Sequence, residues 1–82
     1  MENIRDIIMN NNTYKVDDVL TIYIMVNGLY ITSYALTHGD TIDYYKESNM
    51  LTINNTKAFI HNIRDIEEIT SNSINIHIKL SI

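Results

Sequence analysis

The chain has 82 residues, a net charge of −4 and no cysteine. This length is typical of one domain, covering residues 1–82, and the lack of cysteine excludes a disulfide-stapled secreted scaffold. The six Lys and Arg residues are spread along the sequence, whereas binding to a phosphate backbone needs clustered cations. Nucleic acid is therefore the less favoured partner.

The N-terminal stretch does not have the pattern of a targeting signal. It carries Glu2, Arg5 and Asp6 and lacks an apolar run and a small-residue cleavage site. Elsewhere, no apolar segment approaches the roughly 20 residues that cross a bilayer. We therefore expect no membrane association and a cytoplasmic location.

A short helix is predicted over residues 2–11. Ile4, Ile7 and Ile8 recur at the spacing of one helix face. The asparagines at 10–12 can supply the left-handed residue that ends a helix. A helix of this length is marginal alone, so we expect it to pack on a sheet.

Residues 19–26 and 29–36 are predicted to form a hairpin. Both segments are rich in β-branched and aromatic residues, and the even-numbered positions of 19–26 form one aliphatic face. The dipeptide Asn27-Gly28 between them is the preferred sequence of a type I′ turn. This pattern predicts two antiparallel strands joined by two residues.

Further short strands are predicted in the middle of the chain. Two apolar segments follow the hairpin at 41–45 and 50–53, and polar turns separate them at 38–40, 46–49 and 54–55. Short strands at regular spacing favour a meander or a small barrel.

Residues 56–70 allow two interpretations. Isoleucine recurs every third residue from Ile60 to Ile69. On a helix this row, with Phe59, would spread over about half the cylinder. As strands, the segment needs a bend or bulge near 62–65. We favour the bent strand because isoleucine and phenylalanine prefer sheets, and the helix remains the alternative.

The last predicted strand covers residues 74–80. Ile74, Ile76, Ile78 and Leu80 alternate with polar residues, which predicts a half-buried antiparallel strand. The predicted fold class is therefore α+β, mainly antiparallel β, with a short N-terminal helix packed on a four- to six-stranded sheet or small barrel.

The histidines do not form a metal-binding pattern. His38, His61 and His77 lack the close spacing of structural metal ligands, and Asp40 and Asp43 near His38 add too few ligands to complete a site. We predict no metal and no cofactor.

Catalytic patterns are also missing from the sequence. The adjacent carboxylates at 17–18 and 67–68 would point in different directions on a strand, so adjacency does not make an acid–base pair. The sequence contains no GxSxG motif and no phosphate-binding loop, and its two glycines, Gly28 and Gly39, fall in predicted turns. We do not expect an enzyme.

The tyrosines are the candidate site. Simple alternation places Tyr23, Tyr30 and Tyr34 on the face opposite an isoleucine row that includes Ile31. Such a face can bind a partner, and the alternative is that the rings cover a second core layer. The candidate partner-binding residues are Tyr23, Tyr30, Tyr34, Tyr44 and Tyr45.

The order of elements resembles that of Sm-like small barrels, including bacterial RNA chaperones. It comprises a short N-terminal helix, a hairpin at Val26-Asn27-Gly28, further strands and the segment from Ile63 to Ile66. The resemblance implies a ring-forming barrel that binds RNA or a small nucleotide. However, NIRDIEEI lacks that family's basic residues, and the strand 74–80 follows where that fold ends. The cations available to a nucleotide on the tyrosine face would be Lys46, Lys57 or Arg64.

The leading functional hypothesis is a small non-enzymatic interaction protein that binds another protein through a sheet face. The sixteen Ile and eleven Asn residues have AT-rich codons, which indicates an AT-rich genome such as that of a low-GC bacterium, a phage or a large virus. A small acidic protein from such a source fits an inhibitor or regulator of a host protein in the host cytoplasm. We also expect homo-oligomers, because an isoleucine-rich sheet offers edges and faces for pairing.

Overall fold

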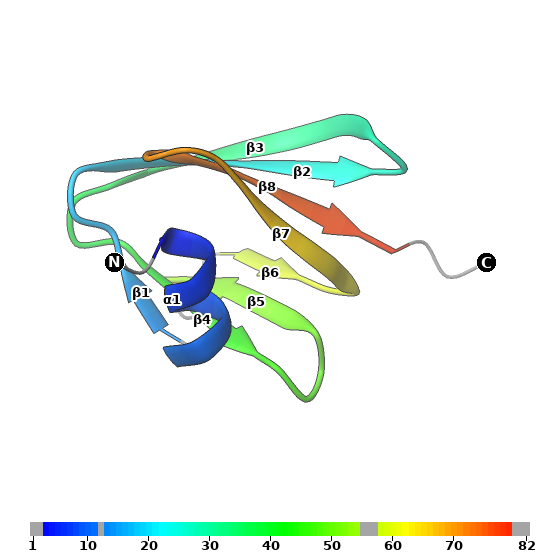
Figure 1. The fold of residues 1–82 in the computed structure, drawn as a ribbon, viewed down its shortest axis with the longest axis horizontal. Helices are drawn as coiled ribbons and strands as arrows, with labels where there is room; N and C mark the ends of the chain where they lie inside the picture. Colours follow the sequence, from blue (N-terminus) through cyan, green and yellow to red (C-terminus); the bar gives the residue numbers. More distant parts are fainter. Residues whose placement is uncertain (1–2, 12, 55–57, 80–82) are drawn as a thin grey trace.

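A single helix is followed by strands alone in this computed structural model (Figure 1), which describes residues 3–11, 13–54 and 58–79. The elements are α1 (Ile4–Asn11), β1 (Thr13–Lys15), β2 (Val19–Val26), β3 (Leu29–Thr37), β4 (Thr41–Tyr45), β5 (Met50–Ile53), β6 (Ala58–Ile60), β7 (Ile63–Thr70) and β8 (Ser73–Ile78). The strands form two four-stranded sheets, with the orders β1-β4-β5-β6 and β3-β2-β8-β7. The α+β, mainly antiparallel class is confirmed.

The hairpin formed by β2 and β3 agrees with the prediction. The two strands pair antiparallel from Val19–Thr37 to Val26–Leu29. Asn27 and Gly28 have φ angles of 53° and 79°, which are the two positive values that a type I′ turn requires. Asparagine and glycine tolerate this left-handed geometry, which explains why this dipeptide joins the strands.

Several strands continue from one sheet into the other. The Val16 N–H donates to the Asp40 carbonyl at 2.8 Å, and the Gly39 N–H donates to the Val16 carbonyl at 2.9 Å. These bonds join the β1–β4 ladder to the β2–β3 ladder across the bend. The chain therefore makes five runs that reverse at turns, at 13–26, 29–45, 50–53, 58–70 and 73–78.

The five runs close into a small barrel through a parallel pair. Each run pairs antiparallel with the next, and β8 then pairs with β2 in parallel. In a meander the first and fifth runs point the same way, so closure between them has to be parallel. The purely antiparallel strand expected at 74–80 is thus corrected: β8 is antiparallel to β7 and parallel to β2, and Leu80 lies outside the described residues.

The bent-strand interpretation of 56–70 is confirmed, and its helical alternative is wrong for the described part, 58–70. Asn62 has a positive φ of 58° between β6 and β7. A register shift follows between Ile63 and Asp65. The bend and this bulge let isoleucines three residues apart face the same core, since Ile60, Ile63 and Ile66 are all buried. Because of these two irregularities, isoleucines spaced three residues apart can all lie on the inner face of one bent strand.

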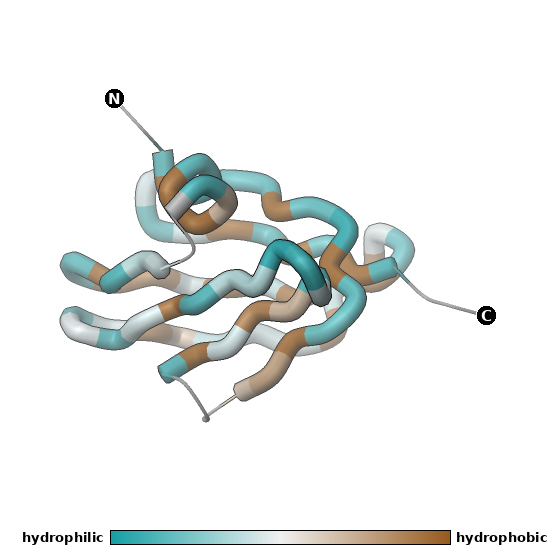
Figure 2. The backbone as a smooth tube through the Cα atoms, turned by 90° about the horizontal axis from the view of Figure 1, so that it is seen from below, coloured by the Kyte–Doolittle hydropathy of each residue, from teal (hydrophilic) through white to brown (hydrophobic). Residues whose placement is uncertain are grey.

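The two sheets enclose one apolar core built mainly from isoleucine. Figure 2 shows hydrophobic segments alternating with hydrophilic ones along the strands, as expected for sheets with one buried face. Ile22, Ile42, Ile74 and Ile76 are fully buried. Together with Leu20 and Ile24, these residues belong to a single cluster that draws on both sheets.

Helix α1 packs across the open side of the two sheets. It contacts β1 and β4 in one sheet and β7 in the other. Ile4 and Ile8 are buried and Ile7 is half-buried, so the apolar stripe predicted over 2–11 faces the core. The helix thereby covers isoleucine surface that neither sheet can bury alone.

The two ends of α1 are formed differently. Asn3 caps the N-terminus, because its Oδ1 accepts the N–H of Asp6 at 2.8 Å. At the C-terminal end, Asn10 and Asn11 are helical and lack the left-handed φ that was expected at 10–12. Asn12 lies outside the described residues.

Each sheet has four strands, within the four to six expected. The described residues contain eight strands in all, because β1 is a polar three-residue strand without clear alternation and the bend at Asn62 divides one predicted strand into two. Within the described ranges, no helix is long and apolar enough to cross a bilayer.

Candidate functional site

The outer face of the β3-β2-β8-β7 sheet carries the candidate site. Because Leu20, Ile22 and Ile24 of β2 point into the core, the alternate residues of β2 and their cross-strand partners point away from it. The strand registers align two outer rows. From β3 to β7 they read Ser33–Tyr23–Asn75–Glu67 and Tyr30–Met25–His77–Asp65.

Two tyrosines meet at one end of these rows. The rings of Tyr23 and Tyr30 lie 6.1 Å apart at an interplanar angle of 63°, which is an edge-to-face contact. The Tyr30 hydroxyl lies 3.3 Å from the Ser33 Oγ. Despite these contacts the residues remain 36% and 58% exposed. The pair is therefore an ordered aromatic surface that water still reaches.

A bulge in β3 decides which tyrosines share this face. The register shifts between Ile24 and Met25, so Ile24 pairs with Thr32, Met25 pairs with Tyr30, and Ile31 is the extra residue. Beyond the bulge, from Thr32 on, the alternation of β3 changes phase. Tyr30 precedes the bulge and, opposite Met25, points outward with Tyr23.

The same bulge corrects two expectations about β3. Tyr34 pairs with Ile22 and packs against the core, so it does not join Tyr23 and Tyr30 on the outer face. Ile31, expected in the buried isoleucine row, is 57% exposed. The prediction rests on uninterrupted alternation, whereas one extra residue reverses the faces of the residues beyond it in β3.

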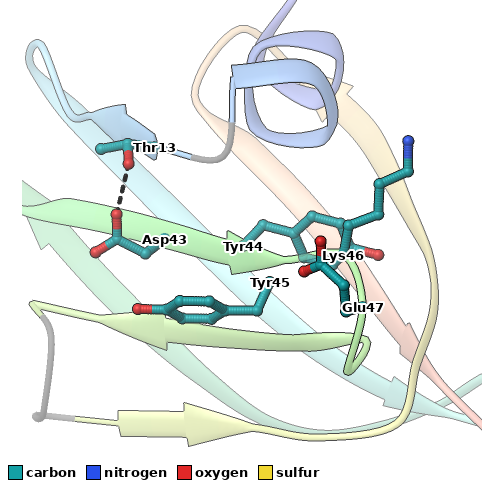
Figure 3. Close-up of a pocket in the computed structure, with 6 residues that line it drawn as sticks. All are labelled: Thr13, Asp43, Tyr44, Tyr45, Lys46 and Glu47. Atoms are coloured by element: carbon teal, nitrogen blue, oxygen red, sulfur yellow. Dashed lines mark hydrogen bonds between the residues drawn. The ribbon is translucent and has the colours of Figure 1, made fainter.

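The last two candidate tyrosines belong to the other sheet (Figure 3). Tyr44 is a core residue with 5% of its surface exposed, and its hydroxyl lies 3.5 Å from the Asn49 Oδ1. Its predicted exposure to a partner is therefore wrong. Tyr45 points the opposite way and is 43% exposed, so it is an accessible tyrosine distant in topology from Tyr23 and Tyr30.

Tyr45 lines a small hollow of about 160 Å³. Inside it the Thr13 hydroxyl donates to the Asp43 Oδ1 at 2.6 Å (Figure 3). The hydroxyl and carboxylate thus satisfy one another instead of pointing at a shared ligand position. The lining residues are Thr13, Asp43, Tyr44, Tyr45, Lys46 and Glu47.

A second hollow of about 240 Å³ lies at the bend of the long strand. It is lined by Asn49, Asn62, Ile63 and Lys79. Among the described lining residues Lys79 alone carries a charged side chain, and the Lys79 N–H is bonded to the Asn62 carbonyl at 2.8 Å. This lining offers amides and one cation but no pair of groups that could act as acid and base.

Two carboxylates occupy the β7 end of the outer rows, and sequence reasoning did not identify them as part of a site. The Glu67 Oε1 lies 2.9 Å from the His77 Nε2, and the Asp65 Oδ1 lies 3.2 Å from the Arg5 guanidinium. Their side chains remain 54% and 51% exposed. Only the pairing register of β7 with β8 brings these residues onto the face of the tyrosines.

The adjacent acids of β7 point in different directions, as a strand requires. Glu67 lies on the outer face, whereas the Glu68 Oε1 accepts the Ile4 N–H at 2.7 Å at the start of α1. The residues 67–68 therefore do not form a carboxylate pair. Glu68 instead compensates the positive end of the helix.

The histidines are separated in space as well as in sequence. His38 Nδ1 lies 2.6 Å from the Asp17 carbonyl in a turn, His77 faces Glu67 on the sheet, and His61 is exposed beside the bend. In the part of the chain that the structure describes, no group of three or more His, Cys, Asp or Glu side chains could hold a metal ion.

The cations considered for nucleotide binding do not join the tyrosine pair. Lys46 lies in the turn after β4 in the other sheet, and Arg64 lies in the bulge of β7, at the edge opposite β3. Lys57 falls outside the described residues. The charges nearest in the outer rows are instead the carboxylates of Asp65 and Glu67.

Comparison of the chain with protein-family models, with curated proteins and with solved structures gave no match.

Proposed function

We propose that this protein is a non-enzymatic binding module that attaches to another protein through its tyrosine–carboxylate face, which consists of Tyr23, Met25, Tyr30, Asp65 and Glu67. The observation that carries the proposal is the exposed edge-to-face tyrosine pair in cross-strand register with two exposed carboxylates. The predicted role of Tyr34 and Tyr44 is dropped, because both pack inward.

The chemistry of this face favours a protein partner. Tyrosine presents a large rigid surface with few rotatable bonds, and such residues supply much of the energy at protein interfaces. Tyr23 and Tyr30 are already ordered by their mutual contact and by strand pairing. Little conformational entropy is then lost when a partner covers them.

The carboxylates indicate the complementary charge. Asp65 and Glu67 are half-exposed and lie on one side of the aromatic pair. A partner that inserts an apolar side chain beside Tyr23 and Tyr30 and places Lys or Arg near these acids would satisfy both halves of the face. The net charge of −4 strengthens attraction to a basic surface.

The source and location belong to the same proposal. The abundance of isoleucine and asparagine codons supports an AT-rich phage or viral genome. On that basis the partner is a host protein that this chain inhibits or regulates in the host cytoplasm. Self-association through the free sheet edge is a further part of the proposal.

The experiment compares matched tyrosine variants in a pull-down followed by quantitative mass spectrometry. The test variants are Tyr23→Ser and Tyr30→Ser. The control is Tyr45→Ser, which removes a tyrosine from the other sheet whose exposed fraction lies between those of the two test residues. We expect the control to retain the partner and each test variant to weaken binding about tenfold or more, which corresponds to about 1.4 kcal/mol. Isothermal titration with the purified partner measures this loss.

Charge reversal tests the other half of the face. Glu67→Lys should weaken the same partner and reduce the salt dependence of its association rate. The proposal is refuted if no protein is specifically retained, or if Tyr45→Ser weakens binding as much as the two test variants do.

RNA or nucleotide binding is the competing proposal, and the aromatic face is the feature in its favour because bases stack on tyrosine. The carboxylates of Asp65 and Glu67 oppose it, since they would face phosphate groups. We expect no binding of labelled oligonucleotides at low salt by fluorescence anisotropy. Salt-sensitive binding that is lost in Tyr23→Ser would instead support the nucleic-acid function.

A further inference from the structure

Strand β3 is a long and uncovered edge of its sheet. It lies at the end of the order β3-β2-β8-β7, with β2 as its one sheet neighbour in the described part of the chain. Figure 1 shows no element beyond it. Its nine residues, LYITSYALT, contain no charge and no proline, and most of them are exposed. Such an edge is a template for another strand.

The outward backbone groups of β3 can be identified from its end. The Thr37 N–H donates to the Asp40 Oδ2 at 2.9 Å, and the Thr37 carbonyl accepts the Asp40 N–H at 3.0 Å. Both groups therefore point away from β2. No register shift lies between Ser33 and Thr37, so Ala35 and Ser33 share this direction. Their N–H and C=O groups face the open edge.

The opposite edge of the same sheet is covered. Arg5 Nε of α1 donates to the Ile66 carbonyl of β7 at 2.7 Å. The sequence IRDIEEIT gives β7 four charged side chains, and two register shifts interrupt its regular form. In the other sheet, the edge strands β1 and β6 have three residues each. Among the described residues, the longest uncovered edge is therefore that of β3.

We propose that a second copy of this chain covers the edge by antiparallel pairing of β3 with β3, with a twofold axis beside Tyr34. Ser33 of each copy then lies opposite Ala35 of the other. The two residue pairs contribute two hydrogen bonds each, four in total, and satisfy all the outward groups at Ser33 and Ala35. An uncharged strand can meet itself without opposing like charges, which suits a contact made twice about a twofold axis.

Neighbouring registers satisfy fewer groups. Pairing Ser33 with itself places Ala35 opposite Ile31, which is the bulged residue. Pairing Ala35 with itself places Ser33 opposite Thr37, whose backbone groups are already bonded to Asp40. The register centred on Tyr34 avoids both. It also brings the two half-buried Tyr34 rings together on the core side of the joined sheet.

This contact uses the edge and leaves the tyrosine–carboxylate face uncovered. The dimer would present two such faces on one continuous sheet, which allows bivalent attachment to a partner. The paired area is small, so we expect a dissociation constant on the order of micromolar or weaker.

Sedimentation equilibrium across a concentration series tests the dimer. The wild-type mass should rise from 9.5 kDa towards twice that value. Ala35→Lys places a charge at the twofold contact and should keep the monomer mass throughout. Ala35→Pro removes the outward N–H alone and should do the same, because that N–H is not bonded to β2. Circular dichroism checks that both variants fold, and Ala35→Lys decides the test if the proline variant unfolds.

Amide hydrogen exchange locates the contact. The N–H groups of Ser33 and Ala35 should gain protection as protein concentration rises, whereas exchange of core amides such as Ile22 should not change. Tyr23→Ser and Tyr30→Ser should leave the dimer intact, so failure of the partner proposal is distinguished from failure of this one. A monomer mass at all concentrations, open-ended aggregates, or a dimer that persists in Ala35→Lys would overturn the inference.

Discussion

The two edge strands of the β3-β2-β8-β7 sheet are similar in length but differ in how far they are protected from pairing with another strand. Strand β7 has four charged side chains and two register shifts. Helix α1 also covers it, since Arg5 Nε donates to the Ile66 carbonyl. Strand β3 has one bulge at Ile31 and then continues regularly to Thr37 without charge. Natural sheets usually protect their edges. The regular and neutral edge of β3 is the feature on which the proposed pairing between two copies rests.

The largest expected effect compares the same substitution on the two edge strands. Ile66 of β7 is fully buried, whereas Ile31 of β3 is 57% exposed. Ile66→Ala should lower the free energy of unfolding by about 2–5 kcal/mol because it leaves a cavity. Ile31→Ala should change it by less than about 0.5 kcal/mol. Urea unfolding at a low, fixed protein concentration measures both.

A milder variant protects this comparison from outright unfolding. A small domain has little stability to lose, so Ile66→Ala could be too unstable to measure. Ile66→Val should then cost about 0.5–1.5 kcal/mol. Equal losses for Ile66→Val and Ile31→Val would contradict the assignment of the two side chains to opposite environments.

A smaller effect is expected when the cover is removed from β7. Arg5→Ala deletes the bond to the Ile66 carbonyl and the ion pair with Asp65. We expect a loss of about 1 kcal/mol, because the guanidinium is partly exposed and water replaces part of its contact. Hydrogen exchange in α1 should accelerate while exchange in β2 changes little.

The uncovered β7 edge should still not dimerise. Three of its four charged residues, Asp65, Glu67 and Glu68, are acids that would repel their counterparts in a second copy across a twofold axis. Arg5→Ala in the Ala35→Lys background should therefore stay monomeric by sedimentation. A dimer in that double variant would show that the charges and bulges of β7 do not prevent it from pairing with a second copy.

The smallest expected effect is on the pKa of Tyr14 in β1, whose phenol is influenced by Glu68 of β7. Burial, followed by the charges of Asp17 and Glu68, raises the pKa of its phenol above the usual 10.0. The unfolded chain then loses this proton at lower pH than the folded one. The Tyr14 contribution to the free energy of unfolding should be constant below about pH 10. It should fall as pH rises from there through the higher folded-state pKa.

Phenolate absorbance, with Tyr14→Phe as the reference, isolates this titration from those of the other tyrosines. Glu68→Gln should lower the Tyr14 pKa slightly, because Glu68 is the weakest of the three causes. An unchanged titration curve in Glu68→Gln would place the carboxylate too far from the ring to matter.

Local patterns predicted the elements that depend on neighbours in sequence. Asn27-Gly28 makes the turn that its φ preferences indicate. The isoleucines between Ile60 and Ile66 all face the core once a bend and a bulge are allowed. The candidate site was less accessible to such reasoning, since Tyr23 and Tyr30 were identified together with Tyr34 and Tyr44, which pack inward.

The sequence by itself determined where most strands run, where they turn and which residues are apolar enough to be buried, because these depend on backbone preferences and side-chain periodicity over a few residues. Tertiary structure alone decided which face each tyrosine takes, since one extra residue opposite Ile24 changes the phase of β3. It also decided that β8 closes the barrel by pairing with β2 in parallel, and that α1 covers the edge of β7 and not that of β3. Those outcomes depend on pairing between segments distant in the chain, which local periodicity does not encode.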